Sequence, residues 1–335
     1  MREVAVVLLN YNGLDLLKKF LPTAIQNSEQ ARVVVIDNAS TDGSSDWINR
    51  NHPNVECITL DSNLGYAGGY NEGLKRVKAA YYALVNTDVE LTPGWLSPLF
   101  NHLESNPSTV VVQPHILDYS KRTHFEYAGA AGGYIDALGI PFCRGRVLKH
   151  CEEDKGQYNS TVPIFWASGA CFLIRSNTFW EFNGFDSRFF AHQEEIDFCW
   201  RIFNAGYTVE ALGKSKVFHV GGATLPPSAK KVFLNHRNSL LMCAKNLPKA
   251  KVYPTLFKKL VLDGMIGLVY LLQFKFRLTF AILRAHLAFY KMLSSTALLR
   301  KNTDQNNRYY LRNSILIDYF VFRRLNFRDL NKNYK

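Results

Sequence analysis

The sequence predicts an α/β fold with a parallel sheet, and two observations support this prediction. Short apolar runs at residues 4–9, 33–36 and 83–85 each end in polar or acidic residues. The segments between them carry apolar residues at helical spacing, as residues 14–25 do. Strands that are apolar throughout are typical of sheets covered by helices on both faces, and strand–helix alternation predicts parallel strands. Such sheets bind ligands at their carboxyl edge, where the strand order switches.

Charge divides the chain of 335 residues into two parts. Residues 249–335 hold 17 Lys and Arg against 4 Asp and Glu, whereas residues 1–248 hold 23 against 24. We therefore expect a nearly neutral globular domain at 1–248 and a basic helical extension at 249–335. Because the extension is also rich in Leu, Phe and Tyr, we expect amphipathic helices that lie on an anionic membrane surface. The aromatic residues at 309–310 and 319–327 fit the same interpretation.

Three observations restrict the partners and the compartment. Within the apolar part of the extension, the longest uncharged run, 264–274, is too short to cross a bilayer, which needs about 20 residues. Nucleic acid is a competing partner for a basic region, but no zinc-finger spacing or other nucleic-acid motif supports it, so we expect none. The other alternative is an appendage that packs on the first domain or on a second subunit. The six cysteines form no C-x-x-C pair and no signal peptide is evident, so we expect a cytoplasmic protein, peripheral on the inner face of the membrane.

Polar residues follow the predicted strands at the edge where a ligand would bind. The first strand ends at Asn10, in a turn that also holds Asn12, and the second ends at Asp37. A carboxylate at the position of Asp37 can accept hydrogen bonds from a ribose hydroxyl or a base N–H. A third strand at 55–60 is expected to be more exposed than the first two.

A glycine-rich stretch at 63–73 contains Asn63, Gly65, Gly69 and Asn71. Glycines at this density let the backbone approach a ligand closely, and the N-terminus of a following helix favours an anion. The stretch lacks the Gly-x-Gly-x-x-Gly spacing and the Gly-Lys-Ser/Thr ending. It therefore fits neither a dinucleotide-binding fold nor a P-loop.

The strand at 83–85 delivers Asn86, Thr87 and Asp88 to the sheet edge. Asp88 can hold a divalent metal that neutralises a nucleotide diphosphate. The alternative is that Asp88 only caps the following turn. His219, at a predicted strand end before two glycines, can ligate a metal or contact the diphosphate, and the alternative is a structural role.

A second acidic cluster places Glu194, Glu195 and Asp197 within four residues. Three carboxylates do not suit a packed core, because each buried charge needs a partner. A favourable interaction with the dipole at a helix start is the alternative explanation. Asp197 can also pair with Arg201 at helical spacing.

Four motifs follow one another along the chain. They are Leu-Leu-Asn-Tyr-Asn-Gly, Val-Ile-Asp-Asn-Ala-Ser-Thr-Asp-Gly-Ser, Asn-Leu-Gly-Tyr-Ala-Gly-Gly-Tyr-Asn-Glu-Gly and Leu-Val-Asn-Thr-Asp-Val-Glu. In this order they resemble family 2 glycosyltransferases, and the nearest branch resembles the rhamnosyltransferase-like enzymes of bacterial surface-polysaccharide assembly. The resemblance covers residues 3–245 and implies a GT-A fold, a Rossmann-like sandwich that binds a nucleotide sugar.

The resemblance also implies roles for the matching positions. Asp37 would contact the base and ribose, and Asp88 matches the last Asp of the family's metal-binding D-x-D motif, with Asn86 in the place of the first. Glu195 stands where the family has the Asp that acts as catalytic base, which leaves Glu194 as the alternative base and Asp197 as the third member of the catalytic group. His219 would be the second metal ligand. The implied donor-binding residues are Asn10, Asn12, Asp37, Asn63, Gly65, Gly69, Asn71, Asn86, Thr87, Gly169 and Arg237, and Arg237 has a salt bridge to the sheet edge as its alternative role.

These expectations combine into one predicted function. The protein is expected to be a metal-dependent, inverting hexosyltransferase-like enzyme that uses Mg²⁺ or Mn²⁺. It would move a sugar from a UDP- or dTDP-sugar to a hydroxyl of a saccharide or lipid-linked acceptor in cell-surface polysaccharide synthesis. Because Asn86 and Glu195 both depart from the commonest family pattern, the alternative is a non-catalytic nucleotide-sugar-binding or scaffold protein of the same fold.

Overall fold

A nine-stranded sheet forms the centre of the computed structural model, which describes residues 4–28, 30–221, 228–298 and 308–331. Its strands are β1 (Val4–Asn10), β2 (Arg32–Asp37), β3 (Glu56–Thr59), β4 (Tyr81–Asn86), β5 (Val89–Leu91), β6 (Thr109–Asp118), β11 (Val162–Ile164), β12 (Cys171–Arg175) and β13 (Thr208–His219). The helices around it are α1 (Leu14–Gln26), α2 (Ser44–Asn51), α3 (Gly65–Leu74), α4 (Leu96–Ser105), α5 (Ser176–Glu181), α6 (Glu194–Asn204) and α7 (Ala229–Asn246), with a 3₁₀ turn η1 (Ser187–Phe189).

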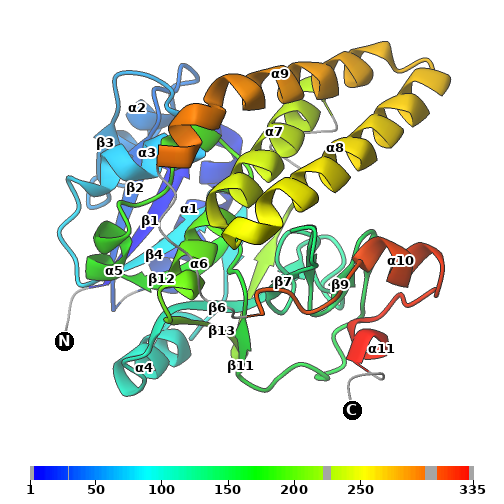
Figure 1. The fold of residues 1–335 in the computed structure, drawn as a ribbon. Coiled ribbons are helices and arrows are strands. Elements are labelled where there is room, and N and C mark those ends of the chain that lie inside the picture. Colours follow the sequence, from blue (N-terminus) through cyan, green and yellow to red (C-terminus); the bar gives the residue numbers. More distant parts are fainter. Residues whose placement is uncertain (1–3, 29, 222–227, 299–307, 332–335) are drawn as a thin grey trace.

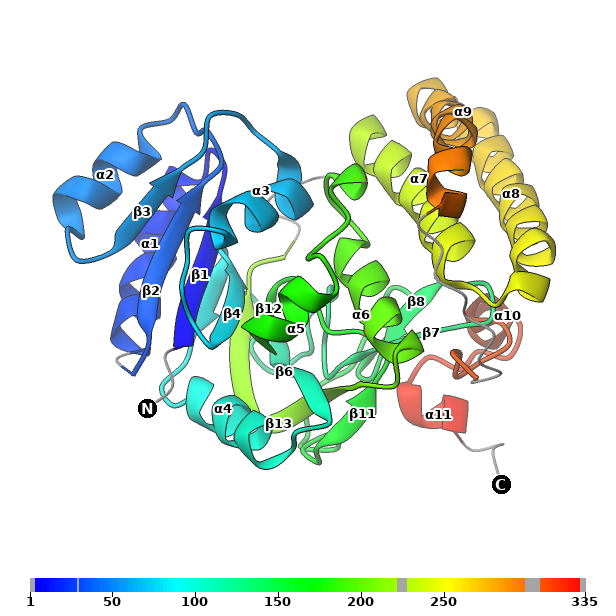
Figure 2. The ribbon, with the colours of Figure 1, turned by 60° about the vertical axis from the view of Figure 1, so that its left-hand side comes forward.

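Helices cover both faces of the sheet, so the strand side chains enter two separate cores (Figures 1 and 2). Leu17 of α1 and Leu99 of α4 belong to the core on one face. Tyr70 of α3 and Phe198 of α6 belong to the core on the other face. This two-sided burial is the reason why the strands are apolar throughout, and it confirms the predicted α/β class.

The first half of the sheet is parallel, with the strand order β3-β2-β1-β4. Asn10 pairs with Asp37 and Leu9 pairs with Asn86, so the ends of three neighbouring strands lie at one edge. The edge strand β3 is less buried than β1 and β2, as the sequence predicts.

The second half of the sheet is mixed, which the expectation of a parallel sheet did not include. β12 runs antiparallel to β4 and β6, because the chain enters β12 from the carboxyl edge, where Ala170 O accepts a hydrogen bond from Asn86 N. β13 runs parallel to β6 and antiparallel to β5, and His219 at its end pairs with Val89. This register brings His219 beside Asp88, although the two residues lie far apart in the sequence.

A smaller antiparallel sheet lies between β6 and β11 in the chain. Its strands are β7 (Gly133–Ile135), β8 (Pro141–Cys143), β9 (Arg146–Val147) and β10 (His150–Cys151). The C-terminal segment 308–331 packs against it, with helices α10 (Ile315–Phe320) and α11 (Phe327–Asn331). Leu311 N donates to Ile135 O, and Phe327 N donates to a carboxylate oxygen of Glu152. Tyr309 and Phe327 are buried and so do not face a membrane, whereas Phe320, Val321 and Phe322 of the same segment are exposed.

The remaining helices are α8 (Lys249–Leu272) and α9 (Phe276–Leu298), which confirm that the extension is helical. They run side by side as a hairpin that projects from the sheet, with α7 packed against both (Figure 1). The proposed domain division at 248/249 falls between α7 and α8. Within the described ranges, no helix combines the length and the apolarity needed to cross a membrane.

Candidate active site

The ends of β4 and β13 bring together the first acidic centre. Asp88 is 1% exposed, and its Oδ1 lies 3.1 Å from His219 Nε2. His219 Nδ1 lies 3.3 Å from Glu126 Oε2, so the imidazole stands between two buried carboxylates. Burial disfavours the charged imidazole, but the hydrogen bond to Asp88 and the nearby carboxylate of Glu126 outweigh this effect and raise the pKa of His219 to about 10. This pKa belongs to the metal-free centre, in which a protonated imidazole stands between two carboxylates; a metal ion would bind the ring only after it loses this proton.

One oxygen of this centre is left without a partner. Asp88 Oδ2 is buried and accepts no hydrogen bond from any described residue, which is unfavourable for a carboxylate. A cation would satisfy this oxygen, and a carboxylate with an imidazole is a donor set that binds divalent metals. Across the described part of the chain, no group of three or more His, Cys, Asp and Glu side chains is placed to hold a metal ion. Asp88 and His219 fit a metal that takes its remaining ligands from phosphates and water.

The turns after β1 and β2 bind each other through their polar side chains. Asp37 is fully buried, and its Oδ1 accepts a hydrogen bond of 2.7 Å from Ser40 N. Asn10 Nδ2 donates to Ser40 Oγ, and Asn12 Oδ1 accepts from Thr41 N. Asn10 Oδ1 is buried and has no partner among the described residues. These contacts hold Asn10, Asn12 and Asp37 together at the sheet edge, as expected from the sequence.

The glycine-rich stretch serves close packing at two positions. Gly65 has a φ of +73°, and a Cβ there would lie 2.3 Å from Phe190 O. A Cβ on Gly69 would lie 2.9 Å from a methyl carbon of Leu9, so this glycine lets α3 approach β1. Asn63 Oδ1 accepts a hydrogen bond from Gly65 N and thereby fixes the start of α3.

Tyr66 connects the end of β4 with the second acidic centre. Its hydroxyl donates to Gly169 O at 2.7 Å, and a Cβ on Gly169 would lie 2.8 Å from that hydroxyl. Burial raises the pKa of Tyr66, and the neighbouring Tyr70, Glu194 and Glu195 raise it further. Gly169 and Tyr66 therefore lie between the strand end that carries Asn86 and Thr87 and the helix that carries the two glutamates.

The second acidic centre stands on the first turn of α6, directly after a strained turn. Phe190, His192 and Gln193 have φ values of 64°, 73° and 69°, a region that costs a non-glycine residue roughly 1–3 kcal/mol. Oε2 of Glu194 and Oε2 of Glu195 are both buried, and neither has a hydrogen-bond partner among the described residues. Strain of this kind is typical of functional sites.

Unlike the carboxylates of Asp88 and Glu126, which flank His219, the two glutamates have no cation that compensates their charge. The ion pairs found among the described residues do not involve either side chain. Burial raises the pKa of Glu195 to about 7. Burial, together with the charge of Glu195, raises the pKa of Glu194 well above its usual range. A carboxylate whose pKa lies near 7 is suited to accept a proton at neutral pH.

Helix α7 holds the strained turn in place. Arg237 Nη2 donates to the carbonyl oxygens of Arg188 and Phe189, both at 2.9 Å. Asn238 Nδ2 donates to the carbonyl oxygens of Phe189, Ala191 and His192. The guanidinium of Arg237, predicted to bind the donor or a carboxylate, thus binds backbone carbonyls of the turn before α6.

Asp197 binds three residues that line a cavity of about 550 Å³ beside α6, namely Arg201, Lys245 and Asn246. Its Oδ2 accepts from Arg201 Nε and Lys245 Nζ, and its Oδ1 accepts from Asn246 Nδ2. The pairing of Asp197 with Arg201 is the one that helical spacing predicts.

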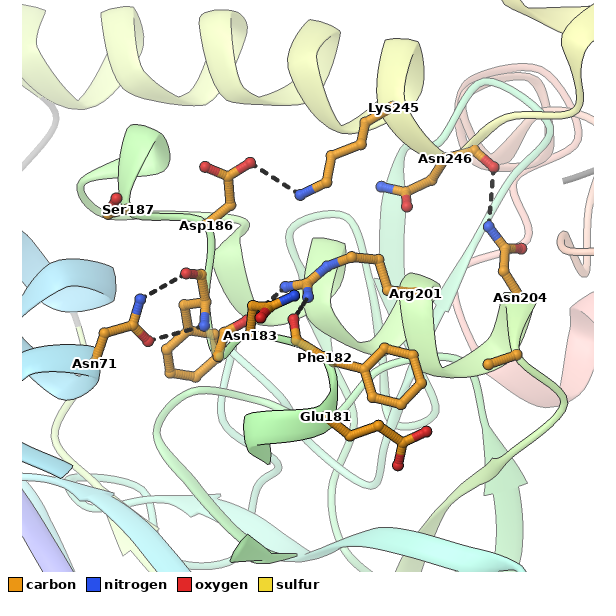
Figure 3. A pocket seen from close by; sticks show the side chains of 13 residues that line it. Asn71, Glu181, Phe182, Asn183, Asp186, Ser187, Arg201, Asn204, Lys245 and Asn246 are labelled. Carbon is orange, nitrogen blue, oxygen red and sulfur yellow. Dashed lines mark hydrogen bonds and ion pairs between the residues drawn. The ribbon is translucent and has the colours of Figure 1, made fainter. Parts of the chain in front are cut away.

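Several polar side chains that line this cavity bind one another or the backbone around it (Figure 3). Lys245 pairs with Asp186, and both amide atoms of Asn71 bind the backbone of Phe185, at 2.7 and 2.9 Å. Asn204 Nδ2 donates to Asn246 O. We therefore interpret the polar groups around this cavity as structural contacts that hold α6 in place. Asn71 and Asp197 belong to these contacts.

Comparison with known proteins decides the family. The family model described as "Glycosyl transferase family 2" matches residues 5–182, which is more than half of the chain. The chain belongs to glycosyl transferase family 2. It is similar to the N-acetylglucosaminyl-diphospho-decaprenol L-rhamnosyltransferase of Mycobacterium tuberculosis, with 26% identity over 229 residues that cover 64% of this chain and 75% of the relative. This similarity confirms the predicted rhamnosyltransferase-like branch.

Solved structures confirm the GT-A fold of this glycosyltransferase. GalNAc-T7 with UDP, GalNAc and Mn²⁺ has a TM-score of 0.56 and 15% identity, and the match covers 72% of this chain and 47% of that one. The S. aureus TarS 1-349 structure in complex with UDP-GlcNAc has a TM-score of 0.56 and 14% identity, and the match covers 89% of this chain and 83% of that one.

Sequence reasoning on this glycosyltransferase missed Glu126 and Tyr66. Glu126 lies in a loop-rich stretch with no periodic pattern, and only the pairing of β13 with β6 brings His219 near it. Tyr66 stands inside the glycine-rich stretch, where the sequence pattern indicates no role for an individual aromatic side chain. Asn238 follows Arg237 in the sequence, and its three hydrogen bonds to the turn before α6 depend on tertiary packing.

Proposed function

We propose that this glycosyltransferase moves a sugar from a UDP- or dTDP-sugar to a hydroxyl of a saccharide or lipid-linked acceptor, with inversion at the anomeric carbon. Two observations carry the proposal: the uncompensated carboxylate of Glu195, whose Oε2 is buried without a partner among the described residues, and the unsatisfied carboxylate oxygen of Asp88 at the sheet edge. One group is thus suited to take a proton, and the other is suited to hold a cation. The rhamnosyltransferase relative supports a sugar acceptor that is carried on a lipid diphosphate.

Asp88 and His219 are the residues that would hold Mg²⁺ or Mn²⁺. The bound metal would supply charge stabilisation for the departing diphosphate. Glu126 would act as a positioning residue, because a carboxylate beside the second ring nitrogen fixes the orientation and tautomer of a metal-binding histidine. The Mn²⁺ in the GalNAc-T7 structure supports a divalent cation in this fold.

The donor nucleotide would lie along the ends of β1, β2 and β4. Asp37 and Asn10 would contact the base and ribose, because they form the buried polar edge there. Asn12 and Asn63 fix the surrounding turns, and Gly65 and Gly69 let α3 come close. Asn86, Thr87 and Gly169 would line the diphosphate and sugar, whereas Arg237 and Asn71 would act indirectly, by fixing the turn at 188–192 and the backbone of Phe185.

The reaction balances with Glu195 as the base. Glu195 takes the proton from the acceptor hydroxyl, and the acceptor oxygen attacks the anomeric carbon from the face opposite the diphosphate. The bond between the anomeric carbon and the phosphate oxygen breaks, and the diphosphate leaves with the electron pair. Glu194, one residue earlier, would remain protonated and keep the site from holding two negative charges.

A thermal-shift screen tests donor binding. The purified protein is heated with UDP-, dTDP- and GDP-sugars, each with and without Mn²⁺ or Mg²⁺. A ligand that binds only the folded state at a hundred times its Kd stabilises it by about 2.7 kcal/mol. We expect a metal-dependent rise in Tm with a UDP- or dTDP-sugar, and we expect Asp88→Asn to lose the metal-dependent part.

Transfer to a lipid-linked saccharide, followed by product stereochemistry, tests the reaction itself. A product that keeps the anomeric configuration of the donor would contradict the inverting mechanism. Metal-dependent donor binding without transfer to any acceptor would instead favour the non-catalytic alternative.

A further inference from the structure

The α8–α9 hairpin carries most of the exposed apolar surface of the described residues. Of 21 large hydrophobic side chains that are exposed, 14 lie between residues 253 and 290. Phe274, at the tip between the two helices, is 79% exposed, and Leu272 beside it is 70% exposed. We call these 14 side chains the hairpin face, and they are Tyr253, Phe257, Val261, Met265, Leu268, Val269, Leu271, Leu272, Phe274, Phe276, Phe280, Leu283, Leu287 and Tyr290.

The apolar residues of α9 form one stripe along the helix. Phe276, Phe280, Leu283, Leu287 and Tyr290 follow the three- and four-residue spacing of a single helical face. The residues of α9 that are buried, such as Ala285 and Phe289, lie on the opposite side. The stripe therefore points away from the contacts that hold α9 on the protein.

Cations border this stripe. Arg277, Arg284 and Lys291 are exposed and recur every seven residues, so they form a second line beside the apolar one. Lys275 stands at the tip. The one acidic residue of the hairpin, Asp263, is buried and paired with His236 and His286. The accessible surface of the hairpin is thus apolar and positive, without an exposed carboxylate.

We propose that the hairpin face docks on an anionic phospholipid surface, with its apolar side chains among the acyl chains and its cations at the headgroups. Charge complementarity selects this occupant over a second copy of the chain, because a symmetric contact would bring the same cations of both copies together. This inference rests on the proposed function, because docking on a membrane would bring the active site near a lipid-linked acceptor. Lipid binding itself is measured without donor or acceptor.

Vesicle flotation of the full chain tests the proposal. The probes are phosphatidylcholine vesicles without and with roughly one third phosphatidylglycerol, at low and high salt. We expect the wild type to float with the anionic vesicles and to remain behind with the neutral ones. The double variant Leu272→Gln/Phe274→Asn should bind at least about tenfold more weakly. Asn suits the φ of 57° at position 274, so this change supports the local backbone.

Two further variants separate the contribution of the cations to vesicle binding from that of the apolar side chains. Lys275→Gln/Arg277→Gln keeps the apolar face and should reduce the preference for anionic over neutral vesicles. Phe320→Gln removes a side chain of similar exposure (61%) from α10, outside the hairpin, and should bind as the wild type does. An unchanged Tm and donor-induced shift would show that each variant is folded.

Wild-type binding by the Leu272→Gln/Phe274→Asn variant would overturn the proposal, as would an equal loss in Phe320→Gln. Sedimentation velocity without lipid supplies a further test. A dimer that this double variant abolishes would assign the hairpin face to a second copy instead. Vesicle binding by a protein that transfers no sugar would leave this proposal standing and contradict only the proposed reaction.

Discussion

The two acidic centres differ in whether a cation compensates their carboxylates. At the sheet edge, His219 stands between Asp88 and Glu126, so charge is compensated inside the protein. On α6, Glu194 and Glu195 each have a buried oxygen without a partner among the described residues, and no cation pairs with either. The compensated centre stays charged and suits electrostatic binding, whereas the uncompensated pair has raised pKa values and suits proton transfer. The neighbours of a carboxylate in this fold thus decide whether it is suited to bind a cation or to accept a proton.

The largest expected effect comes from removing the proton acceptor of the uncompensated centre. Glu195→Gln keeps the shape of the side chain but cannot take a proton, so kcat should fall by about 100- to 10,000-fold. Donor affinity should stay within about twofold, because the change does not touch the sheet edge. Initial rates and calorimetric titration with the donor measure both quantities. Near-normal transfer by this variant would remove Glu195 as the base.

A smaller effect is expected from weakening the compensated centre. Glu126→Gln keeps an oxygen near His219 but removes one negative charge, so Mn²⁺ affinity should fall by about 10- to 100-fold. The readout is Mn²⁺ binding followed by electron paramagnetic resonance, without donor or turnover. Arg122→Gln is a suitable control, since it breaks an exposed ion pair with Glu90 on the neighbouring strand β5. Unchanged Mn²⁺ affinity in Glu126→Gln would mean that Glu126 does not position His219.

The pH dependence of kcat/KM distinguishes the two glutamates. With Glu195 as the base, kcat/KM should fall about tenfold for each pH unit below about 7, because the protonated carboxyl cannot accept a proton. Glu194→Gln imitates a protonated Glu194, so the variant should keep most of its activity and its inflection near pH 7. If Glu194 were the base, this variant would be inactive.

The smallest expected effect concerns stability. The pKa of Glu195 is raised in the folded state, so folding favours the protonated form. Its contribution to stability is present at acid pH and is lost as the pH rises through about 7. Glu195→Gln should therefore gain stability relative to the wild type at pH 8 and not at pH 4, as measured by urea denaturation. A gain of the same size at both pH values would contradict the raised pKa.

Local sequence pattern determined much of this protein. Continuous apolar runs identify β1, β2 and β4, because a strand covered on both faces must be apolar throughout. Since the ends of neighbouring parallel strands share one edge, the same pattern placed Asn10, Asp37 and Asp88 together. The four motifs, in their order along the chain, indicated the family. These features all depend on short stretches of sequence.

Only the tertiary structure decided which polar side chains are free. Asp197 and Glu195 lie two residues apart on α6. Asp197 forms ion pairs with Arg201 and Lys245, whereas Glu195 has no cation as a partner. Arg237 resembles a free cation in the sequence, but the packing of α7 commits its guanidinium to backbone carbonyls.

The basic extension shows the same limit. Both of its parts are rich in aromatic and cationic residues, so composition alone treats them alike. The structure buries Tyr309 and Phe327 against the small sheet and leaves Phe274 and Leu272 exposed at the hairpin tip. Burial depends on which surfaces meet in space, and that is decided by contacts between residues far apart in the chain.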